Sequence, residues 1–322
     1  MSEKPYTDDQ LLMAARLYYD DGMPQARVAK LVNVSQAKVS RMLAMARKRG
    51  IVTITVQRYD PRHRDLEKSI QKSLALKDVI VIKSATGVPV EELRKTVGHF
   101  SAADVAKMIQ PGAVLAVAGG RAVRELARSL IPSARDMRVT VLQAMGNVDA
   151  SVAPYDALEL ARTIAGRWGG SLLTLNTPAL LPDRKMCDAF LELEQIQTVK
   201  KRLAKATMAL VGVGTPENSV FVDRNLLKPE DRARLSKAGA IGEICGRYFD
   251  ARGRECDTPL KRCVVSIELD ELKKVPQVVG VVAASDRSAA IAAAVKGGIL
   301  KSLVIDQAGA AALVNWCETQ SV

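Results

Sequence analysis

The sequence predicts an α/β protein in two parts: an N-terminal helix-turn-helix domain and a C-terminal doubly wound, mostly parallel, Rossmann-like sheet. Three short helical patterns fill residues 8–49 and are separated by turn-forming residues. Later in the chain, short apolar runs without polar alternation alternate with helical patterns, which is typical of a parallel sheet covered on both faces. The 322 residues suffice for two domains, expected over residues 1–58 and 59–322.

The three helices of the first part are predicted over residues 8–21, 25–32 and 35–49. Gly22 ends the first helix, and Pro24 stands where the second can begin. Asn33 marks the next turn, because Asn tolerates the left-handed backbone conformation better than most residues. Ser35 is a favourable N-cap for the third helix, and Gly50 closes it.

A short strand over residues 51–56 and a charged linker over residues 57–64 are expected next. The second part then contains eight predicted strands, near residues 79–82, 113–118, 138–143, 172–175, 207–211, 263–267, 278–282 and 303–305. Its predicted helices lie over residues 65–76, 90–109, 122–130, 155–168, 229–237 and 288–296. The pattern contains no repeat and no low-complexity segment.

Residues 25–43 fit a helix-turn-helix throughout. Two helices that cross at a steep angle need a small residue at the crossing, and Ala29 supplies it, while Val28, Val34 and Val39 fill the angle between them. The first turns of the third helix then point outward, as in proteins that reach base edges in the major groove. The candidate DNA-binding residues are Gln25, Ser35, Gln36, Ala37, Lys38, Ser40, Arg41, Arg47 and Lys48.

The chemistry and the charge of this segment both favour duplex DNA as a partner. Gln pairs with adenine and Arg with guanine, whereas Arg47 and Lys48 are placed to contact phosphates. Residues 25–64 hold a single acid, Asp60, against ten basic residues, so +9 of the net charge of +12 lies there. The ten are Arg27, Lys30, Lys38, Arg41, Arg47, Lys48, Arg49, Arg58, Arg62 and Arg64. The alternative is a helical hairpin used only for protein contacts.

Composition excludes several other classes of protein. No apolar stretch approaches the roughly 18–20 residues that span a bilayer, and the N-terminus lacks the apolar core of a signal peptide. The five cysteines form no CxxC pair, and His63 and His99, the only histidines, lie far from any cysteine cluster. We therefore expect a cytoplasmic protein with reduced thiols, no metal site and no cofactor.

Three glycine-rich segments follow apolar runs in the second part. They are Ala118–Gly119–Gly120–Arg121, Gly212–Val213–Gly214–Thr215 and Gly239–Ala240–Ile241–Gly242–Glu243. In doubly wound sheets, ligands lie at the carboxyl ends of strands, where loops meet helix N-termini and backbone N–H groups point at anions. Together these segments indicate a small-molecule site.

At this point the chain resembles the SorC/DeoR-type sugar-binding transcriptional regulators over nearly its whole length. The most specific segments are Gly239–Ile244 with Tyr248–Asp250, and Ala289–Ala294 with Gly297–Gly298. Gly212–Gly214 and Leu303–Gln307 also fit. The resemblance implies a sensor domain related in fold to sugar-phosphate isomerases and deaminases, a phosphorylated sugar or similar effector, and an oligomer on paired operator half-sites.

The resemblance also implies the effector-binding residues. Those that match the family's pocket are Gly119, Gly120, Arg121, Ala122, Gln143, Gly212, Gly214, Thr215, Glu243, Arg287 and Asp306. In relatives, the segment matching Gly212–Thr215 cradles a phosphate, and the acid matching Glu243 accepts hydrogen bonds from sugar hydroxyls. Asp306 has a second interpretation, as a helix cap.

Some family positions differ here. Val123 replaces the usual Thr, and Arg287 stands where relatives place a lysine on the effector phosphate. Met145 occupies the position of the Schiff-base lysine of the deoxyribonucleoside regulator, which argues against a covalently bound sugar. An unphosphorylated polyol therefore remains an alternative effector.

Two other functions are less consistent with the sequence. An isomerase- or deaminase-like enzyme would need positioned acid–base partners, which Glu243 and Asp306 lack in the sequence, and it would leave the helix-turn-helix unexplained. A nucleoid-type binder would leave the large second domain unexplained. We therefore expect a regulator of carbohydrate metabolism genes, not an enzyme. Its expected partners are double-stranded operator DNA and a small phosphorylated sugar or polyol, with no membrane, and its expected form is a homodimer or homotetramer.

Overall fold

The computed structural model describes residues 6–55, 57, 59–283 and 287–320. The chain forms two compact units that divide between Asp60 and Pro61. Each unit has its own hydrophobic core, so each is described by itself. No helix in these ranges combines the length and the apolar character that crossing a membrane requires.

The first unit is a three-helix helix-turn-helix, as predicted. Its helices are α1 (Asp8–Ala15), α2 (Gln25–Leu31) and α3 (Gln36–Lys48). The helical pattern expected to reach residue 21 continues beyond α1 as a π-helical turn over Arg16–Asp20. Ser35 caps α3 by accepting a hydrogen bond from the Lys38 N–H, and Asn33 adopts a φ of 53° in the turn before it. Leu11, Val28 and Val39 are fully buried where the helices meet.

The strand expected over residues 51–56 is wrong for its described part. Residues 51–55 form no strand, and residue 56 lies outside the described ranges. An alternating pattern needs a neighbouring strand to satisfy its N–H and C=O groups, and none pairs with residues 51–55. Ile51 and Val52 instead pack partly against the core of the first unit.

The second unit is built on a parallel sheet that, in the described residues, has seven strands in the order β1-β9-β8-β5-β2-β3-β4. The strands are β1 (Asp78–Ile82), β2 (Val114–Val117), β3 (Thr140–Gln143), β4 (Ser171–Leu173), β5 (Met208–Val211), β8 (Gln277–Val281) and β9 (Ser302–Asp306). Apart from the edge strand β4, most of their residues are buried, and β5 and β9 are buried throughout, which is why the sequence shows apolar runs rather than alternation. The predicted doubly wound, mostly parallel fold is confirmed.

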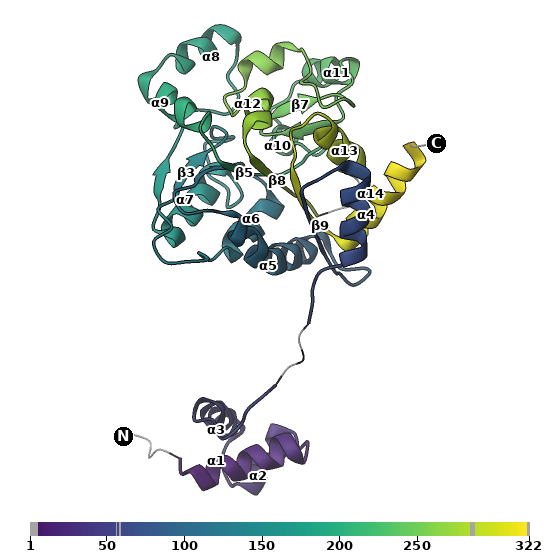
Figure 1. Ribbon diagram of the computed structural model, residues 1–322. Coiled ribbons are helices and arrows are strands. Elements are labelled where there is room, and N and C mark those ends of the chain that lie inside the picture. Colours follow the sequence, from purple (N-terminus) through teal and green to yellow (C-terminus); the bar gives the residue numbers. More distant parts are fainter. Residues whose placement is uncertain (1–5, 56, 58, 284–286, 321–322) are drawn as a thin grey trace. The chain divides into compact units, whose positions relative to one another are not determined.

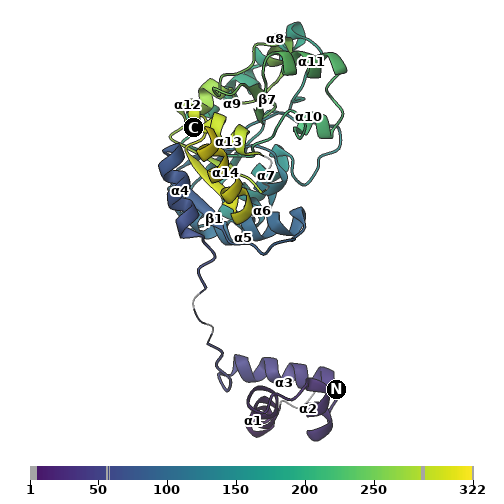
Figure 2. The same cartoon turned by 90° about the vertical axis from the view of Figure 1, so that its right-hand side faces the viewer.

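Helices cover both faces of this sheet (Figure 1). On one face α5 (Val90–Met108), α6 (Arg121–Ser129) and α7 (Ala157–Trp168) pack against alternate strand residues such as Ile80 and Leu115. On the other face α4 (Arg64–Leu74), α9 (Glu194–Leu203), α12 (Leu269–Lys274), α13 (Ser288–Lys296) and α14 (Gln307–Gln320) cover the intervening residues, such as Val81 and Ala116. Figure 2 shows α13 and α14 next to each other on that face.

The remaining elements form a cap, of which the sequence predicted only the helix over residues 229–237. They are α8 (Arg184–Leu191), α10 (Val220–Asp223), α11 (Pro229–Lys237), the hairpin strands β6 (Gly242–Ile244) and β7 (Arg247–Phe249), and a 3-10 helix (Pro259–Cys263). The strand expected over residues 263–267 is wrong, because Val264 and Ser266 form only isolated bridges, with Leu180 and Met145. Residues 264–267 are buried although they do not belong to the sheet. The segment Gly239–Glu243 likewise follows α11 and enters the hairpin rather than ending a sheet strand.

Part of the expected linker is held against the sheet. The backbone of Arg62 forms an isolated antiparallel β-bridge with Ile82 of the edge strand β1. Beside it, the His63 N–H donates to the Val81 carbonyl at 2.8 Å. The Arg62 side chain lies 2.7 Å from Glu67 of α4 and 3.1 Å from Asp104 of α5. Since α5 packs on the opposite face from α4, this ion-pair clamp joins the end of the linker to both faces of the sheet.

Candidate functional site

The topology of the sheet predicts where a ligand binds. From β2 the chain proceeds outward to β3 and β4, whereas β5 leads in the other direction to β8 and β9. The carboxyl ends of β2 and β5 therefore flank the switch point of the sheet, where open α/β folds bind their ligands. Gly119 and Gly120 follow β2, and Gly212 and Gly214 follow β5.

A cavity lies at this switch point and collects most of the predicted effector residues. It is lined by Gly119, Gly120, Arg121, Ala122, Gly212, Gly214, Glu243 and Arg287. Its volume of about 120 Å³ is several times the roughly 10–15 Å³ that one water molecule needs, so it accommodates a small organic ligand. The hairpin residue Cys245 and Met145, in the loop after β3, also line it.

Three predicted residues do not line the cavity. Gln143 is fully buried, where its side-chain amide donates to Asn147 and its oxygen accepts from the Leu175 N–H. Asp306 is also fully buried and accepts a hydrogen bond from the Gly309 N–H in the first turn of α14, which agrees with its second interpretation as a helix cap. Thr215 stands in the loop beside Gly214, partly exposed.

The cavity also includes polar residues that sequence reasoning missed. Arg94 comes from α5, Tyr155 and Asp156 precede α7, and Asp223 ends α10. Tyr155 and Asp156 are the first two residues of the helix predicted over residues 155–168, which begins two residues later, at Ala157, and leaves them in the loop region after β3. A search that included the residues at the start of each helix that follows a strand would have found them. Arg94 and Asp223 belong to helices and carry no such signal.

The basic residues of the cavity are held from several sides. Arg121 lies 2.9 Å from Asp223, and its guanidinium carbon lies 5.2 Å from the centre of the Tyr155 ring. Arg224 lies 5.4 Å from the same ring and bonds Asp149 and Asp156 at 3.2 and 3.4 Å. Both ring distances are within the range of cation–π contacts. These interactions fix Arg121 at the first position of α6.

Helix α6 also presents its N-terminus to the cavity. Gly120 stands at the N-cap of α6, where no described side chain bonds the first amides, and Arg121 and Ala122 line the cavity. The free N–H groups of a helix N-terminus carry partial positive charge and bind anions. Together with Arg94, Arg121 and Arg287, they make this side of the cavity suited to an anionic ligand.

Glu243 faces these groups from the hairpin and is 6% exposed. Its carboxylate accepts a hydrogen bond from the Gly246 N–H, and a Cβ atom at Gly214 would lie 2.7 Å from its Oε2. A larger residue at position 214 would therefore force the Glu243 carboxylate out of this position. Burial raises the pKa of Glu243 from 4.5 to about 7, although the Gly246 N–H and the charge of Arg287 favour its ionised form and Asp223 opposes it.

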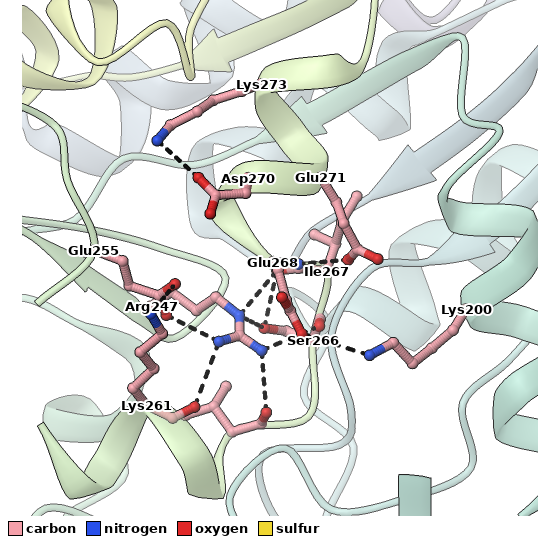
Figure 3. Close-up of polar contacts among 11 residues, drawn as sticks. Lys200, Arg247, Glu255, Lys261, Ser266, Ile267, Glu268, Asp270, Glu271 and Lys273 are labelled. Carbon is pink, nitrogen blue, oxygen red and sulfur yellow. Dashed lines mark hydrogen bonds and ion pairs between the residues drawn. The ribbon is translucent and has the colours of Figure 1, made fainter. Parts of the chain in front are cut away.

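The hairpin that carries Glu243 is anchored by Arg247, which is 5% exposed (Figure 3). Its Nη1 lies 2.9 Å from Glu255, and the guanidinium donates to the Ser266 hydroxyl and to the carbonyls of Val264 and Ile267. The turn between the strands, Cys245–Gly246, has positive φ at both residues, as two-residue hairpin turns of type I′ require. Arg247 thus holds the segment 264–267 and the hairpin together beneath the cavity.

The predicted DNA-binding residues share one region of the first unit. Ser35, Gln36, Ala37, Ser40, Arg41, Arg47 and Lys48 are exposed, and Gln25 and Lys38 are partly exposed. Arg49, by contrast, is bound to Asp8 at 2.7 Å.

Within the ranges that the structure describes, no group of three or more His, Cys, Asp or Glu residues is placed to hold a metal ion. A helix-turn-helix joined to a separate ligand-binding α/β unit defines a ligand-responsive transcriptional regulator.

Comparisons with known proteins agree with that class. Residues 61–315 match the family described as "Putative sugar-binding domain". The chain is 25% identical over 307 residues to the sorbitol operon regulator of Klebsiella pneumoniae, covering 95% of this chain and 97% of that protein. It is 27% identical over 308 residues to the deoxyribonucleoside regulator of Bacillus subtilis, covering 94% and 96%. The crystal structure of the full-length sorbitol operon regulator superposes with a TM-score of 0.76, covering 96% of this chain and 100% of that one.

The chain belongs to this sugar-binding family of SorC/DeoR-type transcriptional regulators. The resemblance seen in the sequence is thereby confirmed. The relatives are transcriptional regulators rather than enzymes, which also confirms that this chain is a regulator.

Proposed function

We propose that this regulator binds operator DNA through α3 and that a phosphorylated sugar or polyol in the cavity controls this binding. The observation that carries the proposal is the convergence of Arg94, Arg121, Arg287 and the N-terminus of α6 on one cavity that also contains Glu243. Guanidinium groups and helix N-termini bind phosphate, and a carboxylate accepts hydrogen bonds from sugar hydroxyls. The site therefore combines the two kinds of group that a phosphorylated sugar needs.

The wider role follows from the names of the relatives. The sorbitol operon regulator and the deoxyribonucleoside regulator are named for sugar and nucleoside systems, so this chain regulates genes of carbohydrate metabolism. It acts in the cytoplasm, where its operator lies, as a homodimer or homotetramer, since two copies present two α3 helices to paired half-sites.

A thermal-shift screen with matched pairs tests the effector class. Each neutral hexose, pentose and hexitol is compared with its own monophosphate. A ligand at about 100 times its dissociation constant stabilises the protein by about 2.7 kcal/mol, which is readily detected. We expect the phosphates to stabilise the protein and their parents to do so weakly. Stabilisation by a neutral hexitol alone would instead identify an unphosphorylated polyol effector.

The pH dependence of effector binding is expected to follow Glu243. Burial raises the pKa of this group to about 7, so lowering the pH below this value protonates the carboxylate that is proposed to accept hydrogen bonds from sugar hydroxyls. The dissociation constant of a bound sugar phosphate should therefore rise by up to about ten-fold per pH unit below about pH 7 and level off above it. Titration calorimetry at about pH 6, 7 and 8 measures this change.

The variant Glu243→Gln is the control for this measurement, because the phosphate of the ligand itself titrates near the same pH. The Gln side chain keeps an acceptor oxygen but does not ionise. Only the part of the pH dependence that disappears in the variant belongs to Glu243. Identical pH profiles for the two proteins would contradict the assigned role.

The clamp formed by Arg62, Glu67 and Asp104 is proposed to transmit effector binding to the linker. Arg94 lines the cavity, and Asp104 of the same helix holds Arg62 at the end of the linker. A shift of α5 on effector binding would therefore move Asp104 and, with it, Arg62 at the end of the linker. Such coupling requires only that the effector bind two states with different affinity.

The variant Asp104→Asn tests the clamp. We expect it to bind the effector as the wild type does, while the ratio of DNA dissociation constants with and without effector moves toward one. Lys107→Met is the matched control, because it removes the exposed partner of Asp104 at 3.5 Å and leaves Arg62 in place. Fluorescence anisotropy on a labelled operator gives the ratio. An unchanged ratio in Asp104→Asn would remove the clamp from the mechanism.

A further inference from the structure

One basic residue of the cavity, Arg94, comes from a part of the fold where no strand ends. It lies in the second turn of α5 and lines the cavity with Arg121 and Arg287, and its side chain is 13% exposed. The roles implied by the family resemblance rest on strand-end loops and the hairpin. They give no role to this helical residue.

Close packing of α5 on α6 explains why Arg94 reaches the cavity. A Cβ atom at Gly98 would lie 2.4 Å from the carbonyl carbon of Glu125, so only glycine permits the two helices to approach this closely. Arg94 stands one turn before Gly98 on α5, and Arg121 stands one turn before Glu125 on α6. Figure 1 shows these helices side by side, and both arginines lie at the cavity.

The guanidinium groups of Arg94, Arg121 and Arg287 thus line one cavity, although their positive charges repel one another. Burial lowers the pKa of Arg94, and the charges of Arg121 and Arg287 lower it further, while Glu91 opposes the shift. The Glu91 carboxylate lies 2.5 Å from Nη1 of Arg94, but it is half exposed and also lies 3.6 Å from Arg124. Because the Glu91 carboxylate is half exposed, solvent screens its attraction to Arg94, so an entering anion can take its place.

We propose that Arg94 selects a doubly charged phosphate group on the effector over a neutral or singly charged group. The inference rests on the proposed function, because it names the residue that makes the cavity specific for a phosphorylated ligand. In the structure Glu91 holds the Arg94 guanidinium in place. When the phosphate binds, it takes the place of Glu91 and accepts two parallel N–H bonds from the fork, while the first amides of α6 bind its other oxygens.

The variant Arg94→Met tests the proposal by titration calorimetry. The probes are hexose and hexitol 6-phosphates, the parent hexose and hexitol, and a hexuronate, which carries a single negative charge. Hydrogen bonds to charged groups contribute enough that we expect the phosphates to bind about 10- to 100-fold more weakly. The dissociation constants of the neutral sugars and of the hexuronate should change by less than about two-fold between the wild type and the variant. Arg94→Lys keeps the positive charge but lacks the planar pair of N–H donors, so its affinity for the phosphates should lie between those of the wild type and Arg94→Met.

Two further variants separate this role from a structural one. Arg124→Met removes the other arginine that faces Glu91 but does not line the cavity, so it should leave phosphate affinity unchanged. Glu91→Gln removes the competing carboxylate and should tighten phosphate binding several-fold. Such a gain cannot come from damage to the fold.

The possible outcomes distinguish this inference from the proposed function. If the wild type binds sugar phosphates and Arg94→Met binds them equally well, the role of Arg94 is wrong and the proposed effector class stands. Equal losses in Arg94→Met and Arg124→Met would also overturn the inference. If the wild type binds only neutral sugars, the phosphorylated effector and the role of Arg94 fail together.

Discussion

Replacing Arg247 with methionine is expected to lower the free energy of unfolding of the second unit by about 3–5 kcal/mol, the usual cost of removing one partner from a buried ion pair. Methionine fills much of the space of the arginine stem but makes none of its bonds. The Glu255 carboxylate, whose side chain is 10% exposed, would then lie buried without its main counter-ion. The carbonyls of Val264 and Ile267 would lose a donor as well.

Urea unfolding followed by tryptophan fluorescence measures this loss, because both tryptophans of the chain, Trp168 and Trp316, belong to the second unit. Arg254→Met is the matched control. Arg254 lies 2.8 Å from Asp250 just beyond the same hairpin, but its side chain is 65% exposed, so its loss should cost no more than about 1 kcal/mol. Equal losses in the two variants would show that Arg247 is no more important than a surface arginine.

A functional effect should accompany the loss of stability. Arg247 begins β7, and the turn before it positions Cys245 and Glu243 at the cavity. Under conditions in which Arg247→Met is still folded, we expect weaker effector binding together with unchanged operator binding, because α3 belongs to the other unit. In the double variant Arg247→Met/Glu255→Gln, part of the stability should return, because the unpaired buried charge is gone.

Arg41→Ala is expected to abolish operator selectivity. Arg41 is exposed in the second turn of α3, where recognition helices reach base edges. A bidentate contact from arginine to guanine discriminates against the wrong base by about 1–3 kcal/mol, or up to about a hundred-fold in affinity. Effector binding should not change, since the cavity lies wholly in the second unit.

Binding to an operator duplex and to a scrambled duplex, each at several salt concentrations, measures this selectivity. Lys48→Ala is the control, because Lys48, the last residue of α3, is expected to contact phosphate rather than bases. It should weaken binding to both duplexes equally and reduce the salt slope by about one. If Arg41→Ala retained the selectivity of the wild type, another element would be the one that reads the bases.

Much of the fold could be predicted from local patterns. The helix-turn-helix follows from Ala29, Asn33 and Ser35, because a close crossing, a left-handed turn and an N-cap each demand particular residue types. The seven strands of the sheet follow from apolar runs of the right length. The run 263–267 shows the limit of this reasoning, since burial makes a segment apolar whether or not it joins the sheet. Residues 51–55 show another, since alternation without a partner produces no strand.

The candidate site divides in the same way. By itself, the sequence predicted the class of protein, a ligand site at the ends of the strands that became β2 and β5, and the glycines that line the cavity there. Each of these features depends on residues that are close together in the sequence. Only the tertiary structure decided that Arg94 and Asp223 join the cavity while Gln143 and Asp306 are buried away from it. The physical reason is that the crossing of α5 over α6 and the fold of the cap bring together residues that are distant in the chain, and no local pattern records such contacts.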